Sequence, residues 1–120
     1  MIIGIDNGLD GGIVAISKHT GDIIDKTIMP TTHRAGKREV ESRKIYEWIM
    51  DLGQCADDFL VAVEEPLKHA KSSQAVRSMG ISFGKIMGVC ESRQWEHCCV
   101  SVHKWQKFML GNIPKGQTKQ

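Results

Sequence analysis

The chain has 120 residues, a formal net charge of +2, 41% hydrophobic residues and 25% charged residues. This composition is typical of a single globular domain, 1–120, and excludes a disordered chain. No apolar run is long enough to cross a bilayer, no signal peptide begins the sequence, and no Cys-x-x-Cys pair suggests a metal framework. We therefore expect a reduced, cytoplasmic protein with no membrane contact.

The first thirty residues predict three strands. β-Branched residues fill 2–6 (IIGID), and Asn7-Gly8 ends this run with a turn signal. Two further strands are expected at 12–17 (GIVAIS) and 23–29 (IIDKTIM). Because short turns join the three strands, they should form an antiparallel meander. The polar, basic stretch 30–39 (PTTHRAGKRE) is interpreted as a loop.

The remaining pattern alternates helices and strands. Ile45, Trp48, Ile49 and Leu52 have the spacing of an amphipathic helix that ends at Gly53. The apolar run 59–63 suits a central strand parallel to the first, followed by a long helix from 73, a strand at 98–102 and a short helix at 103–110. The expected fold is α/β, with a mixed five-stranded sheet in the order 3-2-1-4-5 and flanking helices.

Two acidic residues are expected at the carboxyl ends of the first and fourth strands, namely Asp6 and Glu64. Parallel neighbours would bring these ends to about 5 Å from each other, at a switch point where α/β sheets bind ligands. Carboxylates this close repel each other, and a bound Mg²⁺ would relieve the repulsion. Alternatively, Asp6 caps the following turn and Glu64 is a solvated strand end.

Several motifs resemble the RuvC-type Holliday junction resolvases of the ribonuclease H-like superfamily. Residues 3–9 (IGIDNGL) and 12–16 (GIVAI) are similar to the opening of these proteins, and 61–64 (VAVE) is similar to their second acidic motif. The glycine-containing helix from Ser73 and the segment 100–119 also resemble the family. The resemblance implies a metal-dependent endodeoxyribonuclease that cuts branched DNA. It makes Asp6 and Glu64 catalytic ligands of Mg²⁺, with Mn²⁺ as a substitute, and we expect a homodimer.

The chain departs from this family at its C-terminal end. The family completes its metal site with two further ligands on a last helix, whereas no acidic residue follows Glu96 here. We therefore expect a domain truncated at its C-terminus, with half a metal site and little or no activity. The missing helix should also uncover apolar surface that favours self-association or a partner chain.

Basic residues are the candidate contacts to DNA phosphates, although a solvated lysine face is an alternative. They are Lys68, Lys71, Arg77, Lys104, Lys107, Lys115 and Lys119. A helical stripe of Gly80, Gly84 and Gly88 is expected to pack on the sheet, with a dimer partner or DNA as alternatives. Two other functions stay open: a non-catalytic module that binds branched DNA, and an ATP-binding fragment of the actin and sugar-kinase type.

Overall fold

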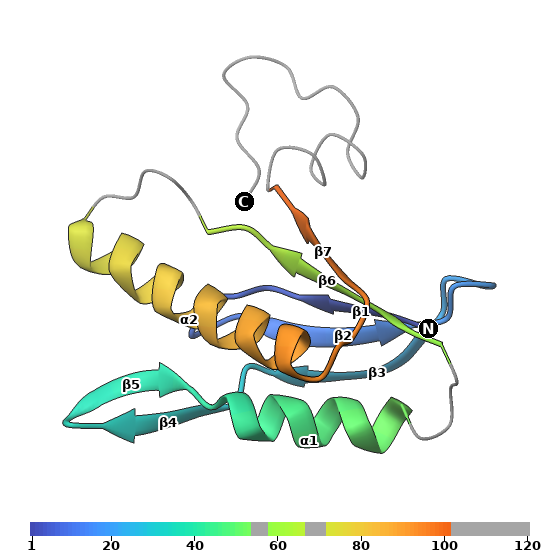
Figure 1. Cartoon of the computed structure of the whole chain (residues 1–120), viewed down its shortest axis with the longest axis horizontal. Coiled ribbons are helices and arrows are strands. Elements are labelled where there is room, and N and C mark those ends of the chain that lie inside the picture. The colour runs from blue at the N-terminus through green and yellow to red at the C-terminus, as the bar shows by residue number, and fades with distance from the viewer. Residues whose placement is uncertain (54–57, 67–71, 102–120) are drawn as a thin grey trace, which may run out of the picture.

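The computed structural model describes residues 1–53, 58–66 and 72–101. Five strands form one mixed sheet in the order β3-β2-β1-β6-β7, and two more form a separate hairpin, β4-β5 (Figure 1). The elements in chain order are β1 (Ile2–Ile5), β2 (Gly12–Ile16), β3 (Ile23–Ile28), β4 (Thr31–Arg34), β5 (Lys37–Val40), α1 (Ser42–Gly53), β6 (Leu60–Glu64), α2 (Ser73–Ser92) and β7 (His97–Val100).

β1 is the strand at which the direction of pairing changes. It pairs antiparallel with β2 and parallel with β6. On the outer sides of these two strands, β3 is antiparallel to β2 and β7 is parallel to β6. The predicted α/β fold and the predicted strand order are therefore confirmed, with β6 and β7 as the fourth and fifth strands of the sequence prediction.

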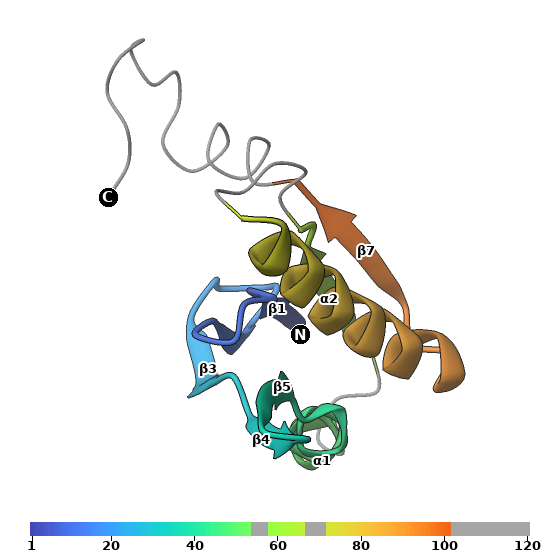
Figure 2. The same ribbon diagram turned by 90° about the vertical axis from the view of Figure 1, so that its left-hand side faces the viewer.

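One face of the sheet carries the hydrophobic core. Alternate residues of a strand point to opposite faces, and the residues of one parity are buried in β1, β2 and β6. Figure 2 shows α1 and α2 on the same side of the sheet. The buried cluster includes Ile3, Ile5, Ile13, Ala15, Val61 and Val63 from the sheet and Ile45, Ile49, Ile86 and Cys90 from the helices.

Helix α2 begins as its sequence predicts. The Ser72 hydroxyl accepts a hydrogen bond from the Ala75 backbone N–H at 3.1 Å, so Ser72 is the N-cap. No helix in the described ranges is long and apolar enough to cross a membrane.

The stretch 30–39, which was expected to be a loop, instead contains most of the β4-β5 hairpin. Arg34 pairs with Lys37, and the two residues between them, Ala35 and Gly36, have positive φ angles of 52° and 77°. Two successive positive φ angles identify a type I′ turn, which matches the twist of a hairpin. The prediction was wrong because Ala-Gly is a weak form of the usual Asn-Gly signal, and the flanking residues are polar on both faces.

The glycine stripe of α2 faces away from the sheet. Gly80, Gly84 and Gly88 are exposed, and a Cβ atom added to any of them would meet nothing within 4 Å. The buried residues of α2, Ser82 and Ile86 among them, lie on its opposite side. The expectation that this stripe packs on the sheet was therefore wrong, because the larger side chains of α2 make that contact.

Candidate active site

Asp6 and Glu64 lie at the carboxyl ends of two hydrogen-bonded parallel strands. Ile5 of β1 pairs with Val63 of β6, and each carboxylate is the next residue along its strand. Ile5 and Val63 point into the core, so strand alternation places both carboxylates on the other face of the sheet. Asp6 is exposed and Glu64 is half-buried. The predicted adjacency of the strand ends is confirmed, whereas the role of the two carboxylates stays a prediction.

Asn7 connects these two strand ends. The residue is only 3% exposed, and its Nδ2 atom donates a hydrogen bond of 2.7 Å to the backbone oxygen of Glu64. The bond joins the residue after Asp6 to the residue that carries the second carboxylate, so it fixes the two strand ends relative to each other. From the sequence, Asn7 was expected only to be part of a turn. The position of Asn7 in the sequence indicates its burial, because Ile3, Ile5 and Asn7 are alternate residues and therefore point to the same, inward-facing side.

The turn from β1 to β2 packs directly on Asp6. The Asp6 backbone N–H donates to the Gly12 oxygen at 3.0 Å, and that of Gly11 donates to the Gly8 oxygen at 3.0 Å. A Cβ atom on Gly11 would lie 2.2 Å from the Asp6 backbone oxygen and 3.0 Å from its Cγ. Only glycine fits this close approach, so the turn holds Asp6 in place. This requirement was not predicted, although the adjacent glycines at 11 and 12 indicate a close approach of the backbone.

Two other acidic residues lie near the candidate site without joining it. The Asp10 carboxylate accepts a hydrogen bond of 2.9 Å from Arg38. Glu65 is exposed, and its charge acts on the thiol of Cys99, which lies against α2. Desolvation, and then the charge of Glu65, raise the pKa of that thiol. By strand alternation Glu65 faces the same side of the sheet as the buried Val63, which is the helix side, and Glu64 faces the other side.

The donor set fits a hard divalent cation only in part. The two carboxylates offer the oxygen ligands that Mg²⁺ prefers, and Mg²⁺ commonly keeps several water molecules. Within the described ranges, no group of three or more His, Cys, Asp or Glu side chains could hold a metal ion. Asp6 and Glu64 are therefore suited to contribute to such a site, and a second cation would need ligands from elsewhere.

Of the basic residues predicted to contact DNA, the structure describes Arg77. It is exposed on the first half of α2 and lines a cavity beside the β4-β5 hairpin. The others lie outside the described residues, namely Lys68, Lys71, Lys104, Lys107, Lys115 and Lys119.

Comparisons with known proteins identify the fold. No family model and no curated protein matches the sequence. Among solved structures, the chain is similar to RuvC of Thermus thermophilus in complex with a Holliday junction substrate, with 11% sequence identity and a TM-score of 0.64 over 88% of this chain and 67% of that one. A second structure of Thermus thermophilus RuvC has 16% identity and a TM-score of 0.49 over 92% of this chain and 69% of that one. The first likeness shows that this chain has the ribonuclease H-like fold of RuvC.

Proposed function

We propose that the chain is a metal-dependent endodeoxyribonuclease that cuts branched DNA. The observation that carries this proposal is the placement of Asp6 and Glu64 directly after the register partners Ile5 and Val63 of two parallel strands. One of these strands, β1, is where antiparallel pairing changes to parallel pairing. Ligands of α/β sheets favour such switch points at the strand carboxyl ends. The fold is shared with a protein whose structure was solved with a Holliday junction, which supports branched DNA as the substrate.

In this proposal Asp6 and Glu64 hold Mg²⁺, for which Mn²⁺ can substitute. When bound, the metal supplies an activated water and stabilises the leaving oxygen of a phosphodiester. The residues of the chain itself position the two carboxylates: Asn7 fixes one strand end to the other, and Gly11 lets the turn pack on Asp6. Because the described part of the chain offers no third ligand, we expect full activity to require acidic residues beyond those described.

The same shortage of ligands favours a second candidate, a non-catalytic module that binds branched DNA. Such a protein would keep the fold and the phosphate contacts but would cut nothing in Mg²⁺ or Mn²⁺. It would also be insensitive to the loss of either carboxylate, since DNA binding does not need them.

The deciding experiment replaces each carboxylate with its amide. Asp6→Asn and Glu64→Gln should each reduce Mg²⁺-dependent cutting of a four-way junction by more than about 100-fold, with binding in EDTA nearly unchanged. Glu65→Gln is the matched control, because it removes the same charge one residue away on the other side of the sheet and should cut normally. Near wild-type cutting by either amide variant would show that these residues are the wrong ones. Tight binding with no cutting by wild type would support the module.

We also propose that the chain forms a homodimer and acts in the cytoplasm. Self-association is supported by the edge strand β3, on which Ile23, Ile24 and Ile28 are 62%, 51% and 82% exposed. Sedimentation equilibrium tests this proposal. Wild type should be dimeric at micromolar concentration, and Ile28→Lys should shift the equilibrium towards monomer.

A further inference from the structure

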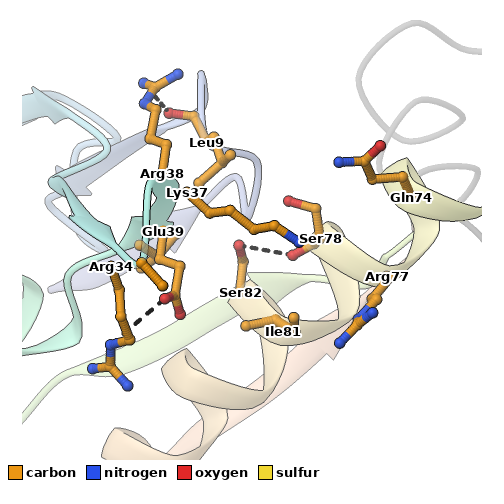
Figure 3. A pocket seen from close by; sticks show the side chains of 12 residues that line it. Leu9, Arg34, Lys37, Arg38, Glu39, Gln74, Arg77, Ser78, Ile81 and Ser82 are labelled. Atoms are coloured by element: carbon orange, nitrogen blue, oxygen red, sulfur yellow. Dashed lines mark hydrogen bonds and ion pairs between the residues drawn. The ribbon is translucent and has the colours of Figure 1, made fainter.

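A basic cavity lies between the β4-β5 hairpin and α2. Its volume is ≈ 540 Å³, and its walls come from the hairpin, the first half of α2 and the turn that follows β1 (Figure 3). The charged side chains of the lining are Arg34, Lys37, Arg38, Arg77 and Glu39. Four cations therefore face one carboxylate, which makes the cavity suited to an anionic ligand.

Two of these cations already have contacts of their own. Arg38 donates to the Asp10 carboxylate at 2.9 Å and to the Leu9 backbone oxygen at 2.9 Å. Arg34 lies 3.6 Å from the carboxylate of Glu39. Arg38 therefore ties the hairpin to the turn that packs on Asp6, and the cavity lies at the same end of the sheet as the two carboxylates.

Glu39 is neutralised from a second side as well. Lys85 of α2 lies 3.3 Å from the Glu39 carboxylate and also donates to the Val40 backbone oxygen at 2.7 Å. The single acidic side chain of the lining is thus shared between Lys85 and Arg34, so it does little to repel an incoming anion. These contacts also fasten the base of the hairpin to α2.

Lys37 and Arg77 carry charges that these contacts do not use. Neither has an ion pair within 4 Å among residues 1–53, 58–66 and 72–101. They come from opposite walls, Lys37 from β5 and Arg77 from α2, and both are exposed. In Figure 3 the Lys37 side chain extends across the cavity towards Ser78 of α2. The two charges are therefore available to one ligand between the walls.

We propose that this cavity binds the phosphate backbone of a DNA strand, with Lys37 and Arg77 contacting the phosphates. The inference rests on the proposed function and adds to it a binding surface. Lys and Arg side chains supply most phosphate contacts in DNA complexes, and these contacts set the position of the protein on the strand. Since Leu9 and Asp10 follow Asp6 closely and are bound to the hairpin, a strand held here lies on the helix side of the sheet, at the end that carries the two carboxylates.

The first test removes the charges of Lys37 and Arg77. The double variant Lys37→Gln with Arg77→Gln should bind a four-way junction in EDTA about 10-fold or more weakly than wild type at low salt. It should also reduce the slope of log affinity against log salt by about 1.8, which is about 0.9 for each lost phosphate contact. The conservative double variant, Lys37→Arg with Arg77→Lys, should bind as wild type does. The matched control is Lys18→Gln with Arg93→Gln, which also removes one lysine and one arginine. These residues contact Asp58 and the Tyr46 ring, neither of which lines the cavity, so the slope should stay unchanged.

The second test uses the wild-type chain, so it does not depend on how a variant folds. Acetylation of Lys37 and Lys18 is followed by mass spectrometry, with and without saturating junction DNA, single-stranded DNA or ATP. DNA should protect Lys37 several-fold and should leave Lys18 reactive, and the two DNA forms show whether a duplex arm or a single strand occupies the cavity. Protection by ATP in place of DNA would overturn the proposal in favour of a nucleotide site.

The two failures are distinguishable. If wild type binds and cuts the junction while Lys37 stays unprotected and the double glutamine variant matches its control, only the assignment of the cavity is wrong. If wild type binds no DNA at all, the cavity and the proposed function fail together.

Discussion

Replacing Asn7 tests how the two candidate ligands are held. Asn7→Leu keeps a side chain of similar volume but removes the donor that binds the Glu64 backbone oxygen at 2.7 Å. Asn7 is only 3% exposed and Glu64 is half-buried, so water can replace the lost donor only in part. An unsatisfied buried acceptor costs about 1–3 kcal/mol. At about 4 °C for each kcal/mol in a domain of this size, the melting temperature should fall by about 4–12 °C.

The assay combines urea denaturation with junction cutting. Asn7→Asp should destabilise more than Asn7→Leu, because it places a carboxylate against the carbonyl oxygen of Glu64. Asn7 is a positioning residue, so Asn7→Leu should lower kcat for cutting while leaving DNA affinity in EDTA unchanged. If both variants unfold at the wild-type urea concentration, the amide does not hold β1 to β6. A normal kcat in a destabilised variant would confine Asn7 to a structural role.

Three further predictions concern backbone fit and a buried thiol. Gly11→Ala should destabilise the protein by about 3 kcal/mol or more, because the new Cβ atom would lie 2.2 Å from the Asp6 backbone oxygen. Gly84→Ala should stabilise it by about 0.5–1 kcal/mol, because nothing lies within 4 Å of its new Cβ atom. Equal urea midpoints for the two variants would contradict this prediction. Ala35→Asn should raise the melting temperature, since Asn tolerates the φ of 52° better than Ala, and a lower value would refute the turn assignment. Burial raises the pKa of the Cys90 thiol to about 11, so iodoacetamide should label this thiol slowly at pH 8. The contribution of the protonated thiol to the free energy of unfolding is fully present below pH 9 and should be lost as the pH rises towards 11.

The sheet could be predicted because its signals are local. β-Branched runs mark β1 and β6, and the short turns between the first three strands allow only neighbouring antiparallel pairs. The β4-β5 hairpin was missed because its local turn signal is weak and its contacts to the rest of the chain come from residues far away in sequence. Arg38 binds a turn 28 residues earlier, and Lys85 binds a backbone oxygen 45 residues before it. The orientation of the glycine stripe was equally hidden, since spacing shows that glycines share a face of α2 but not which face meets the sheet.

In the candidate site, too, some residues could be predicted from the sequence and others could not. Asp6 and Glu64 could be predicted because each ends a strand whose partner followed from the order of the elements. Asn7 was missed because the local Asn7-Gly8 turn signal concealed its inward-facing position. The basic cavity was missed because its walls come from three separate segments of the chain. Arg77 was predicted as a phosphate contact from its position after the second acidic motif. The cavity wall that faces Arg77 could not be predicted, because that wall is the hairpin.

The contacts of the hairpin indicate which part of the cavity can adjust to a bound strand. At Glu39 and Val40, near the base of the hairpin, Lys85 makes its two contacts with its side chain only 23% exposed, so water screens this anchor little. The Arg38–Asp10 pair is more open, with side chains 41% and 91% exposed, and a surface pair of this kind contributes little to stability. Lys37 follows the turn and has no ion pair in the described ranges. We therefore expect the base to stay fixed against α2 while the tip, with Lys37, moves to meet the phosphates.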